Sequence, residues 1–449
     1  MTPLMSLGSF ATALLLSGAL AKQDGYLRHS HPNVNDTSST GLSPAVANIK
    51  SLDTPEFSVR QVRNPQFRRK SGLQAMLDVY AKYKIPLTPE LKRAARVNGL
   101  IINQKVGTQT GTTSATPPGG YDYEFVCPVE IGTPPQTISL NFDSGSSDLW
   151  VFSNDTDPNQ VQGQGIFDAS QSTTAALMPG YNFTITYGDG NYASGIVYTD
   201  TVAVGNASVT GMTIESALDV SAGFTADAPA AGILGLGMST GNTIYPNKQL
   251  TFLDTIKSSL AAPLFTANLI ASNPGEYDFG YIDSSKYTGR IQYGSVDPTS
   301  IYWQFAATGY RVGAEPNASN PNQGYTTLPW RAIADTGTTL LIVPERIVTE
   351  YYAEVSGAVY DAGWGGIVFP CTAATVLPDF TFGIGLFKGN VPGRYINYGA
   401  INTTTCFGGI QTMGNAQFGI MGDILLKAQL VVFDDGNQRV GFANKVLLY

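Results

Sequence analysis

The chain has 449 residues, a formal net charge of −8 at pH 7, only 13% charged residues, 49 Gly and 26 Pro. This length allows two or more domains, and the composition is typical of a turn-rich β protein. Three Cys are too few for a disulfide scaffold, and the only two His, His29 and His31, lie near the N-terminus, so a mature chain without that segment has no Ser-His-Asp triad, Cys-His pair or His-bound zinc.

Residues 1–21 are predicted to be a secretory signal peptide. The run Phe10–Leu20 is apolar but too short to span a bilayer, and small residues precede a cut before Lys22. A buried N-terminal helix is the alternative. We expect extracellular secretion rather than vacuolar delivery, and no later apolar run or lipidation motif predicts a membrane anchor.

Residues 22–106 are predicted to be a basic inhibitory pro-segment. They carry 14 Lys and Arg against 6 Asp and Glu, a net charge of +8, whereas the rest of the chain has 12 basic and 28 acidic residues, a net of −16. This contrast suggests an intramolecular inhibitor held partly by charge; nucleic acid is not an expected partner of a secreted chain. Because Asp and Glu protonate as the pH falls while Lys and Arg stay charged, we expect release by self-processing below about pH 5.

A helix is predicted at 72–84 from the spacing of its apolar residues. It could deliver Lys82 or Lys84 into an acidic site, or these lysines could face solvent. Residues 107–120 form a polar, low-complexity linker at the start of the mature chain. Cleavage of the pro-segment is expected near or within Lys105–Thr113.

The body is predicted to contain an N-terminal lobe at 121–295 and a C-terminal lobe at 296–449. The elements expected in the first lobe are strands at 121–131 and 137–142, a β-hairpin within 181–198, a glycine-broken apolar segment at 231–237, a helix at 250–260, and strands at 277–282 and 290–293. The second lobe repeats this plan, with a helix around 345–355.

Two copies of one motif organise the body. The stretch Leu140-Asn-Phe-Asp-Ser-Gly-Ser-Ser-Asp-Leu-Trp150 returns as Ala332-Ile-Ala-Asp-Thr-Gly-Thr-Thr-Leu-Leu-Ile342, with Asp143 and Asp335 separated by 192 residues. A single Asp-Ser-Gly would be a turn. Two copies indicate related lobes that each bring one carboxylate to a shared site.

From about Gly120 onward the chain resembles the pepsin-like aspartic endopeptidases, above all the secreted fungal aspergillopepsin and penicillopepsin type. The resemblance rests on the two motifs and on Tyr187-Gly-Asp-Gly190, Ile233-Leu-Gly235, Ile420-Met-Gly422 and Tyr277-Asp-Phe-Gly-Tyr-Ile-Asp283. Ser144 stands where most members have Thr, but it keeps the hydroxyl. The resemblance implies a mainly all-β fold of two related lobes with a cleft between them and few short helices, made with an inhibitory pro-segment.

The expected chemistry needs no metal, cofactor or covalent intermediate. Two carboxyls at hydrogen-bonding distance share one proton, so one can act as base and the other as acid towards the same water and carbonyl. The pair titrates as a unit, and the proton is assigned to neither Asp. Three kinds of support are expected: backbone N–H groups brought close by Gly145 and Gly337, bracing of the loops by Ser144 and Thr336, and hydrogen bonds to the outer carboxylate oxygens from Ser146 and Thr338.

By the resemblance, Tyr187 and Gly188 belong to a flap that closes over substrate, with Trp150 as the hydrogen-bond partner of Tyr187. Packed core aromatics are the alternative. An acid at Asp189 resembles the feature of the fungal branch that admits Lys at P1, beside bulky apolar residues. A turn-forming Asp without a substrate role is the other interpretation.

Cysteines and sequons complete the predictions. Cys371 and Cys406 lie in one lobe and are expected to form a disulfide in an oxidising compartment, whereas Cys127 is expected to be a buried free thiol. Glycosylation sequons in the mature region are Asn154, Asn182, Asn206, Asn317 and Asn402.

The sequence therefore predicts a secreted, monomeric acid endopeptidase acting on proteins and peptides. One alternative is a non-catalytic pepsin-like binding protein, which arises when a catalytic Asp is lost; both Asp143 and Asp335 are present with their Gly neighbours. A glycosidase with a carboxylate pair is another alternative, but the matched Asp-Ser/Thr-Gly loops argue against it.

Overall fold

The computed structural model describes residues 109–115, 124–188, 190–314, 322–362, 364–414 and 416–447. The predicted signal peptide, the pro-segment with Lys82 and Lys84, and the residues Asp189 and Asn317 lie outside this part of the chain. Within it, no helix is long and apolar enough to cross a membrane.

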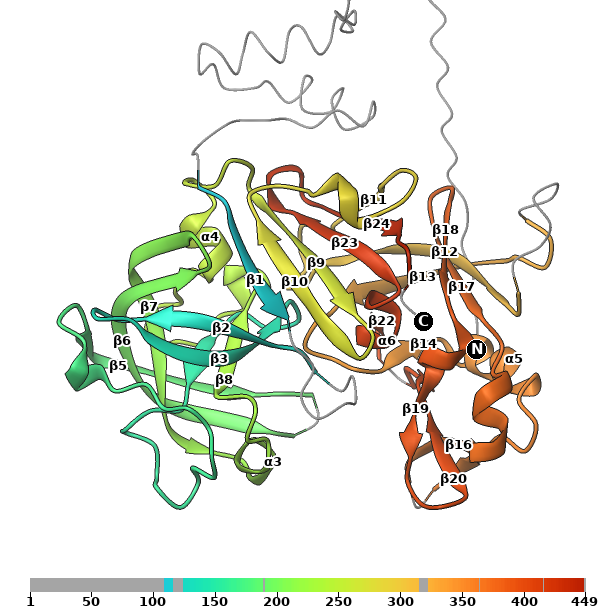
Figure 1. Ribbon diagram of the computed structural model, residues 1–449, viewed down its shortest axis with the longest axis horizontal. Coiled ribbons are helices and arrows are strands. Elements are labelled where there is room, and N and C mark those ends of the chain that lie inside the picture. Colours follow the sequence, from blue (N-terminus) through green and yellow to red (C-terminus); the bar gives the residue numbers. More distant parts are fainter. Residues whose placement is uncertain are drawn as a thin grey trace, which may run out of the picture. The chain divides into compact units, whose positions relative to one another are not determined.

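A seven-stranded sheet builds the N-terminal lobe (green and teal in Figure 1). In spatial order its strands are β2 (Val126–Ile131), β3 (Gln136–Asp143), β8 (Gly232–Gly235), β4 (Leu149–Val151), β7 (Ala207–Val220), β6 (Tyr192–Val204) and β5 (Ala176–Thr186). β2 also pairs with β6, so the sheet closes on itself. Its helices are α3 (Ala222–Ala226) and α4 (Phe252–Ile256).

The C-terminal lobe (orange in Figure 1) contains two sheets. The larger runs β18 (Phe387–Val391), β17 (Phe380–Ile384), β12 (Gln304–Val312), β13 (Thr326–Ala334), β22 (Gly419–Met421), β14 (Leu341–Val343) and β21 (Ile410–Thr412). The smaller runs β15 (Val359–Asp361), β16 (Gly366–Pro370), β20 (Thr405–Gly408) and β19 (Asn397–Ala400). The helices are α5 (Glu345–Ala353) and α6 (Asp423–Leu426).

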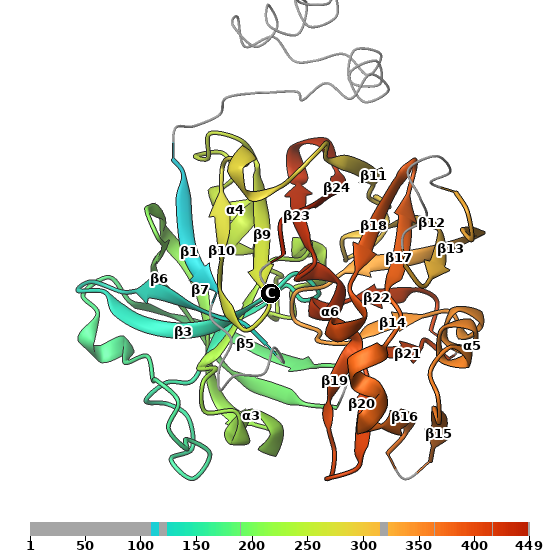
Figure 2. The same ribbon diagram turned by 45° about the vertical axis from the view of Figure 1, so that its right-hand side comes forward.

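A six-stranded sheet lies between the two lobes in both views (Figures 1 and 2). Its order is β1 (Gly111–Ala115), β10 (Asn273–Phe279), β9 (Leu264–Ile270), β23 (Gln429–Asp434), β24 (Arg439–Asn444) and β11 (Gln292–Ser295). Strands assigned from sequence to different lobes thus share one sheet. The short 3-10 helices are η2 (Ala169–Gln171), η3 (Ser239–Gly241), η4 (Ser284–Lys286), η5 (Cys371–Val376), η6 (Gly393–Ile396) and η7 (Asp435–Asn437).

The range 107–120, expected to be a linker, contains strand β1. Its residues alternate buried and exposed along Gly111–Ala115, and all five pair with β10. Without β1, the edge of β10 would have unpaired backbone groups. The hydrogen bonds that β1 makes with this edge favour a strand although the low-complexity composition predicts a linker. The helix expected at 250–260 is also shorter, because α4 ends at Ile256, whereas α5 closely matches the helix expected around 345–355.

The repeated motifs are positioned by the same strand arrangement in each lobe. β3 runs parallel to β8, with Asp143 opposite Gly235, and β13 runs parallel to β22, with Ala334 opposite Met421. β4 and β14 then pair antiparallel with β8 and β22, respectively. This explains why the Leu-Gly and Met-Gly segments recur with the Asp motifs: each pairs beside the strand that carries the Asp.

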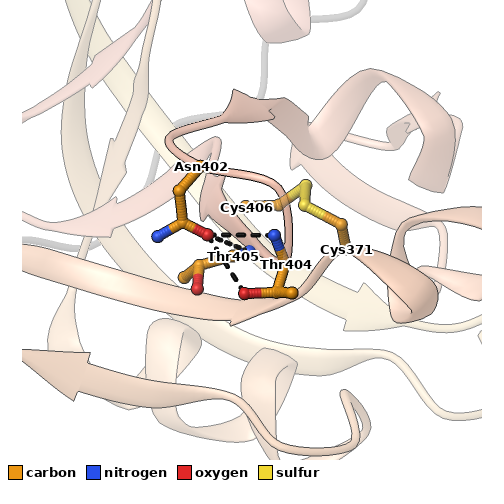
Figure 3. The surroundings of a disulfide bond; sticks show 5 residues. All are labelled: Cys371, Asn402, Thr404, Thr405 and Cys406. Carbon is orange, nitrogen blue, oxygen red and sulfur yellow. Dashed lines mark hydrogen bonds between the residues drawn. A yellow bond between two sulfur atoms is a disulfide. The ribbon is translucent and has the colours of Figure 1, made fainter.

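The disulfide prediction is confirmed. Cys371 and Cys406 join η5 to β20 with Cα atoms 5.0 Å apart (Figure 3). In the same loop, Asn402 Oδ1 accepts hydrogen bonds from Thr404 N–H at 2.9 Å and Thr405 N–H at 2.8 Å. Cys127 is a buried free thiol on β2, as expected, and burial raises its pKa.

Candidate active site

The two repeated aspartates lie at equivalent ends of the parallel strand pairs. Asp143 is the last residue of β3 and Asp335 directly follows β13; each is only 6% exposed. A Cβ placed on Gly145 would lie 2.6 Å from the Asp335 carboxyl carbon, and one on Gly337 would lie 2.4 Å from that of Asp143. Since no side chain tolerates such distances, only glycine lets each motif approach the opposite carboxyl.

Backbone amides bind one oxygen of each carboxyl. Gly145 N–H donates to Asp143 Oδ1 at 2.7 Å, and Gly337 N–H donates to Asp335 Oδ1 at 2.9 Å. These equivalent bonds fix the two carboxyl planes relative to their loops. The geometry therefore presents two similarly held carboxyls to one another.

Hydroxyl support of the outer carboxylate oxygens is unequal. Thr338 Oγ1 donates to Asp335 Oδ2 at 2.6 Å. Ser146 occupies the matching position in the first motif, and its hydroxyl lowers the pKa of Asp143. This buried hydroxyl nevertheless forms no hydrogen bond of normal geometry with any described residue. The bond expected from Thr338 is present, and the one expected from Ser146 is not found among the described residues.

Burial raises the pKa of Asp143 well above its usual range, and the charge of Asp335 raises it further. The Gly145 amide and the Ser146 hydroxyl act in the opposite direction but do not outweigh these effects. The pair therefore retains a proton at pH values where an isolated Asp would be ionised. That proton belongs to the pair as a whole.

Ser144 and Thr336 join the two motifs by reciprocal hydrogen bonds. Ser144 Oγ donates to Ala334 O at 2.9 Å and accepts from Thr336 N–H at 3.0 Å. Thr336 Oγ1 donates to Phe142 O at 2.6 Å and accepts from Ser144 N–H at 3.1 Å. The serine hydroxyl thus makes the same two kinds of bond as the threonine, and neither bond uses a methyl group.

We expect Ser144→Ala to lower both stability and activity. It would leave the buried Ala334 carbonyl and Thr336 amide without partners, and each unpaired buried group costs about 1–3 kcal/mol. Ser144→Thr keeps the hydroxyl and is expected to stay within about threefold of the parent kcat/KM. Melting temperature and kcat/KM on one peptide test this; an unchanged melting temperature in Ser144→Ala would contradict it.

An aromatic group lies beside the carboxyls. Trp150 Nε1 donates to Tyr187 OH at 2.8 Å, and Phe224 in α3 packs edge-on against both rings, with centroids 4.9 Å from Trp150 and 5.4 Å from Tyr187. Burial and then the charge of Asp143 raise the pKa of Tyr187. Sequence reasoning missed Phe224, because a five-residue helix without a motif gives no local signal of this contact.

A second buried carboxyl pair lies behind the Asp143 loop and was also missed. Asp148 is fully buried and Glu215, on β7, is 1% exposed. Asp148 Oδ1 accepts from Thr243 N–H at 2.8 Å and Asn242 Nδ2 at 3.1 Å, and Glu215 Oε1 accepts from Asn242 Nδ2 at 3.2 Å. The other two oxygens, Asp148 Oδ2 and Glu215 Oε2, meet no donor from the described residues.

A proton shared by these two carboxyls explains why Asp148 Oδ2 and Glu215 Oε2 have no other donor. Burial raises the pKa of Glu215 well above its usual range, and the charge of Asp148 and a hydrogen bond between the carboxyls add to the rise. Burial also raises the pKa of Asp148, but donors from Thr243 act against it. The pair therefore holds a proton that belongs to both carboxyls.

Four of the predicted sequons fall within the described residues, and all four asparagines are exposed: Asn154, Asn182, Asn206 and Asn402. Asn154 Nδ2 donates to Asp168 Oδ1 at 3.0 Å. The side-chain nitrogen of Asn402 points away from its loop (Figure 3). The glycosylation prediction stays a prediction at each of these residues.

Comparison with known proteins identifies relatives over most of the chain. The family described as "Eukaryotic aspartyl protease" matches residues 124–445. Endothiapepsin of Cryphonectria parasitica is 42% identical over 440 residues, covering 97% of this chain and 98% of that protein. Aspergillopepsin-1 of Aspergillus fumigatus and penicillopepsin-3 of Penicillium janthinellum are each 40% identical, covering 90% of this chain and 96% of those proteins.

The fold is shared with a solved proteinase. The crystal structure of an aspartic proteinase from Irpex lacteus matches with a TM-score of 0.61 at 24% identity, covering 76% of this chain and 98% of that chain. At this identity the likeness bears on the fold alone, and it agrees with the mainly β, two-lobed architecture. The family match and the sequence relatives show that the protein belongs to the eukaryotic aspartyl protease family and is a pepsin-like aspartic endopeptidase.

Proposed function

We propose that Asp143 and Asp335 are the catalytic pair and hydrolyse internal peptide bonds through one activated water. The observation that carries this proposal is the close approach of Gly145 to the Asp335 carboxyl and of Gly337 to the Asp143 carboxyl, which no residue with a Cβ would permit. The raised pKa of Asp143 supports it, because the pair then holds the single proton that the reaction needs. Its substrates are proteins and peptides.

In the proposed reaction the ionised carboxyl takes a proton from the water while the other gives its proton to the substrate carbonyl oxygen. The new C–O bond gives a tetrahedral diol. The C–N bond then breaks as one carboxyl gives its proton to the leaving amine and the other takes a proton from a diol hydroxyl. The pair finishes with one proton, as it began. The Gly145 and Gly337 amides hold Oδ1 of each Asp, so the carboxyls need not reorient during the transfer.

We further propose that the β5–β6 hairpin is a flap over the substrate. Tyr187 lies at its tip, held by Trp150 and Phe224, and Gly188 follows it. An aromatic wall of this kind favours bulky apolar side chains at P1. Lys at P1 would be read by Asp189, so Asp189→Ser would lower Lys-P1 cleavage relative to Leu-P1 cleavage.

Tyr187→Phe is expected to lower kcat/KM by about tenfold, because it removes the hydroxyl that accepts from Trp150 and leaves the indole N–H unpaired. Tyr192→Phe is the matched control, since that hydroxyl binds Asp219 at 3.3 Å in an exposed position of the same hairpin. Steady-state kinetics on one peptide make the comparison. Equal losses in both variants would contradict the role of the Trp150 bond.

We also propose that the enzyme is secreted as a monomeric zymogen without a membrane anchor. The signal-like residues 1–21 support secretion, and the charge contrast between 22–106 and the body supports the zymogen form. Lys82 or Lys84 would bind near the aspartates in the zymogen. The exposed sequons of the body would carry the glycans.

Digestion of haemoglobin at about pH 3.5, with and without a statine-type inhibitor, tests the proposed function. We expect digestion that the inhibitor abolishes, and N-terminal sequencing of the acid-treated chain should place the new terminus near or within Lys105–Thr113. No digestion would favour a non-catalytic binding protein. Digestion that ignores the inhibitor would overturn the aspartate mechanism.

A further inference from the structure

A pocket of about 240 Å³ lies beside the six-stranded sheet. Its walls come from the β9–β10 turn, η4, η6, the end of α6 and the segment after β24: Asn268, Ile270, Ala271, Ser285, Lys286, Tyr287, Thr288, Tyr395, Lys427, Lys445, Val446 and Leu447. Three of these residues are lysines and none is acidic. The chain after residue 106 has a net charge of −16 and only six lysines, so half of them gather here.

Lys445 is the lysine of this pocket whose contacts are all neutral. The residue as a whole is half-buried, and its Nζ donates to Asn268 Oδ1 at 3.0 Å and to Leu269 O. Burial alone lowers the pKa of Lys445 to about 7, with no charged group contributing. Below that pH the ammonium group forms with two neutral acceptors and no adjacent carboxylate, which is unfavourable.

The other charged groups around the pocket do not supply a carboxylate partner for Lys445. Lys286 pairs with Glu276 at 2.9 Å and with Asp278 at 2.6 Å. Glu276 also accepts a hydrogen bond from Asn268 Nδ2 at 3.5 Å. Asp283 lies 3.9 Å from Lys286. Lys427 Nζ lies 5.0 Å from the centre of the Tyr395 ring, and Arg394 lies over the same ring; Tyr287 is the remaining titratable side chain of the wall.

Acidic pH increases the positive charge of this pocket. Lys445 becomes protonated as the pH falls below about 7. Ser285, Tyr287 and Thr288 line the same space, but the Ser285 hydroxyl donates to Asp283 Oδ1 at 2.7 Å and the Thr288 hydroxyl donates to Asn444 O at 3.3 Å. A small oxyanion would therefore meet mainly ammonium donors, and no residue of the wall is acidic.

We propose that this pocket binds a small free oxyanion at acidic pH, with Lys445 Nζ as its main donor. The anion neutralises the ammonium groups and so stabilises the enzyme in acid. The site lies on wall elements that do not carry the aspartates, so the proposal is independent of the catalytic one. The bound oxyanion would stabilise the folded protein at acidic pH and would take no part in peptide hydrolysis.

Thermal unfolding of the full chain tests this, with a statine-type inhibitor present to suppress self-digestion. Millimolar sulfate is compared with chloride at equal ionic strength, at pH 4 and pH 8. We expect sulfate to raise the melting temperature by about 3 °C at pH 4 and by less than about 1 °C at pH 8. In Lys445→Met the pH 4 effect should be lost, and in Lys248→Met, an exposed lysine, it should persist.

A sulfate effect of equal size at both pH values, or one that persists in Lys445→Met, would show general salt action and overturn the proposal. If Lys445→Met does not fold, calorimetric titration of the parent chain with sulfate decides. Saturable binding at pH 4 that is absent at pH 8 supports the site. Absence of saturable binding at pH 4 overturns it.

Discussion

Asp335→Asn is expected to lower kcat/KM for peptide hydrolysis by about 10⁴-fold while leaving the fold intact. The amide cannot give or take the proton that the pair shares, so neither activation of the water nor protonation of the carbonyl is completed. An Asn oxygen can still accept from Gly337 N–H, as Asp335 Oδ1 does at 2.9 Å. The change therefore removes the chemistry and keeps the main contact of the side chain with its loop.

The measurement is kcat/KM on a peptide substrate at about pH 3.5, with the melting temperature of each protein. Asp157→Asn, an exposed aspartate of the same charge, is the matched control and should keep full activity. Self-processing of the zymogen should be lost in Asp335→Asn alone. Residual activity within tenfold of the parent, in a folded variant, would contradict the proposed pair.

The parts of this site that local chemistry determines could be predicted from sequence. The Asp-Ser-Gly and Asp-Thr-Gly turns follow directly from β3 and β13, and the need for Gly145 and Gly337 is visible in the residue types. The hydroxyls of Ser144 and Thr336 follow from the same alignment of the two motifs. Each of these inferences uses residues within two positions of an Asp.

Contacts between distant segments could not be predicted in this way. The six-stranded sheet joins β9 and β10 to β23, and no pattern within a single strand specifies a partner more than 150 residues away. Glu215 lies behind Asp148 because β7 pairs with β4, with Glu215 opposite Trp150. The sequence shows an acid on a strand, and the strand register decides that the acid is buried against another one.

The Asp148–Glu215 pair has a consequence for stability. In the folded protein the pKa of Glu215 is raised, whereas in the unfolded chain it is near its reference value of about 4.3. The folded state therefore binds this proton more tightly than the unfolded chain does. The contribution of this proton to the free energy of unfolding is fully present below about pH 4, and it is lost as the pH rises towards the pKa of the folded state. Raised pKa values of Asp143 and of Glu124, the latter to about 8, act in the same direction.

Glu215→Gln is accordingly expected to raise the melting temperature at pH 7 by more than about 3 °C, with little change at pH 3.5. The amide N–H₂ group can donate to Asp148 Oδ2 in place of the shared proton, and it carries no charge at any pH. The variant thus keeps the acid-state contact and removes the neutral-pH repulsion. Part of the pH dependence should remain, because Asp143 and Glu124 still titrate.

Glu354→Gln, an exposed glutamate at the end of α5, is the control and should leave the melting temperature within about 1 °C at both pH values. A gain of the same size at pH 3.5 and pH 7 would mean that Gln packs better than Glu, and the shared proton would then be the wrong explanation. A rise in melting temperature confined to pH 7 would show that a second proton-sharing pair, Asp148 and Glu215, supports the loop that carries Asp143. The proposed preference for acidic pH would then depend on Asp148 and Glu215 as well as on the proposed catalytic pair.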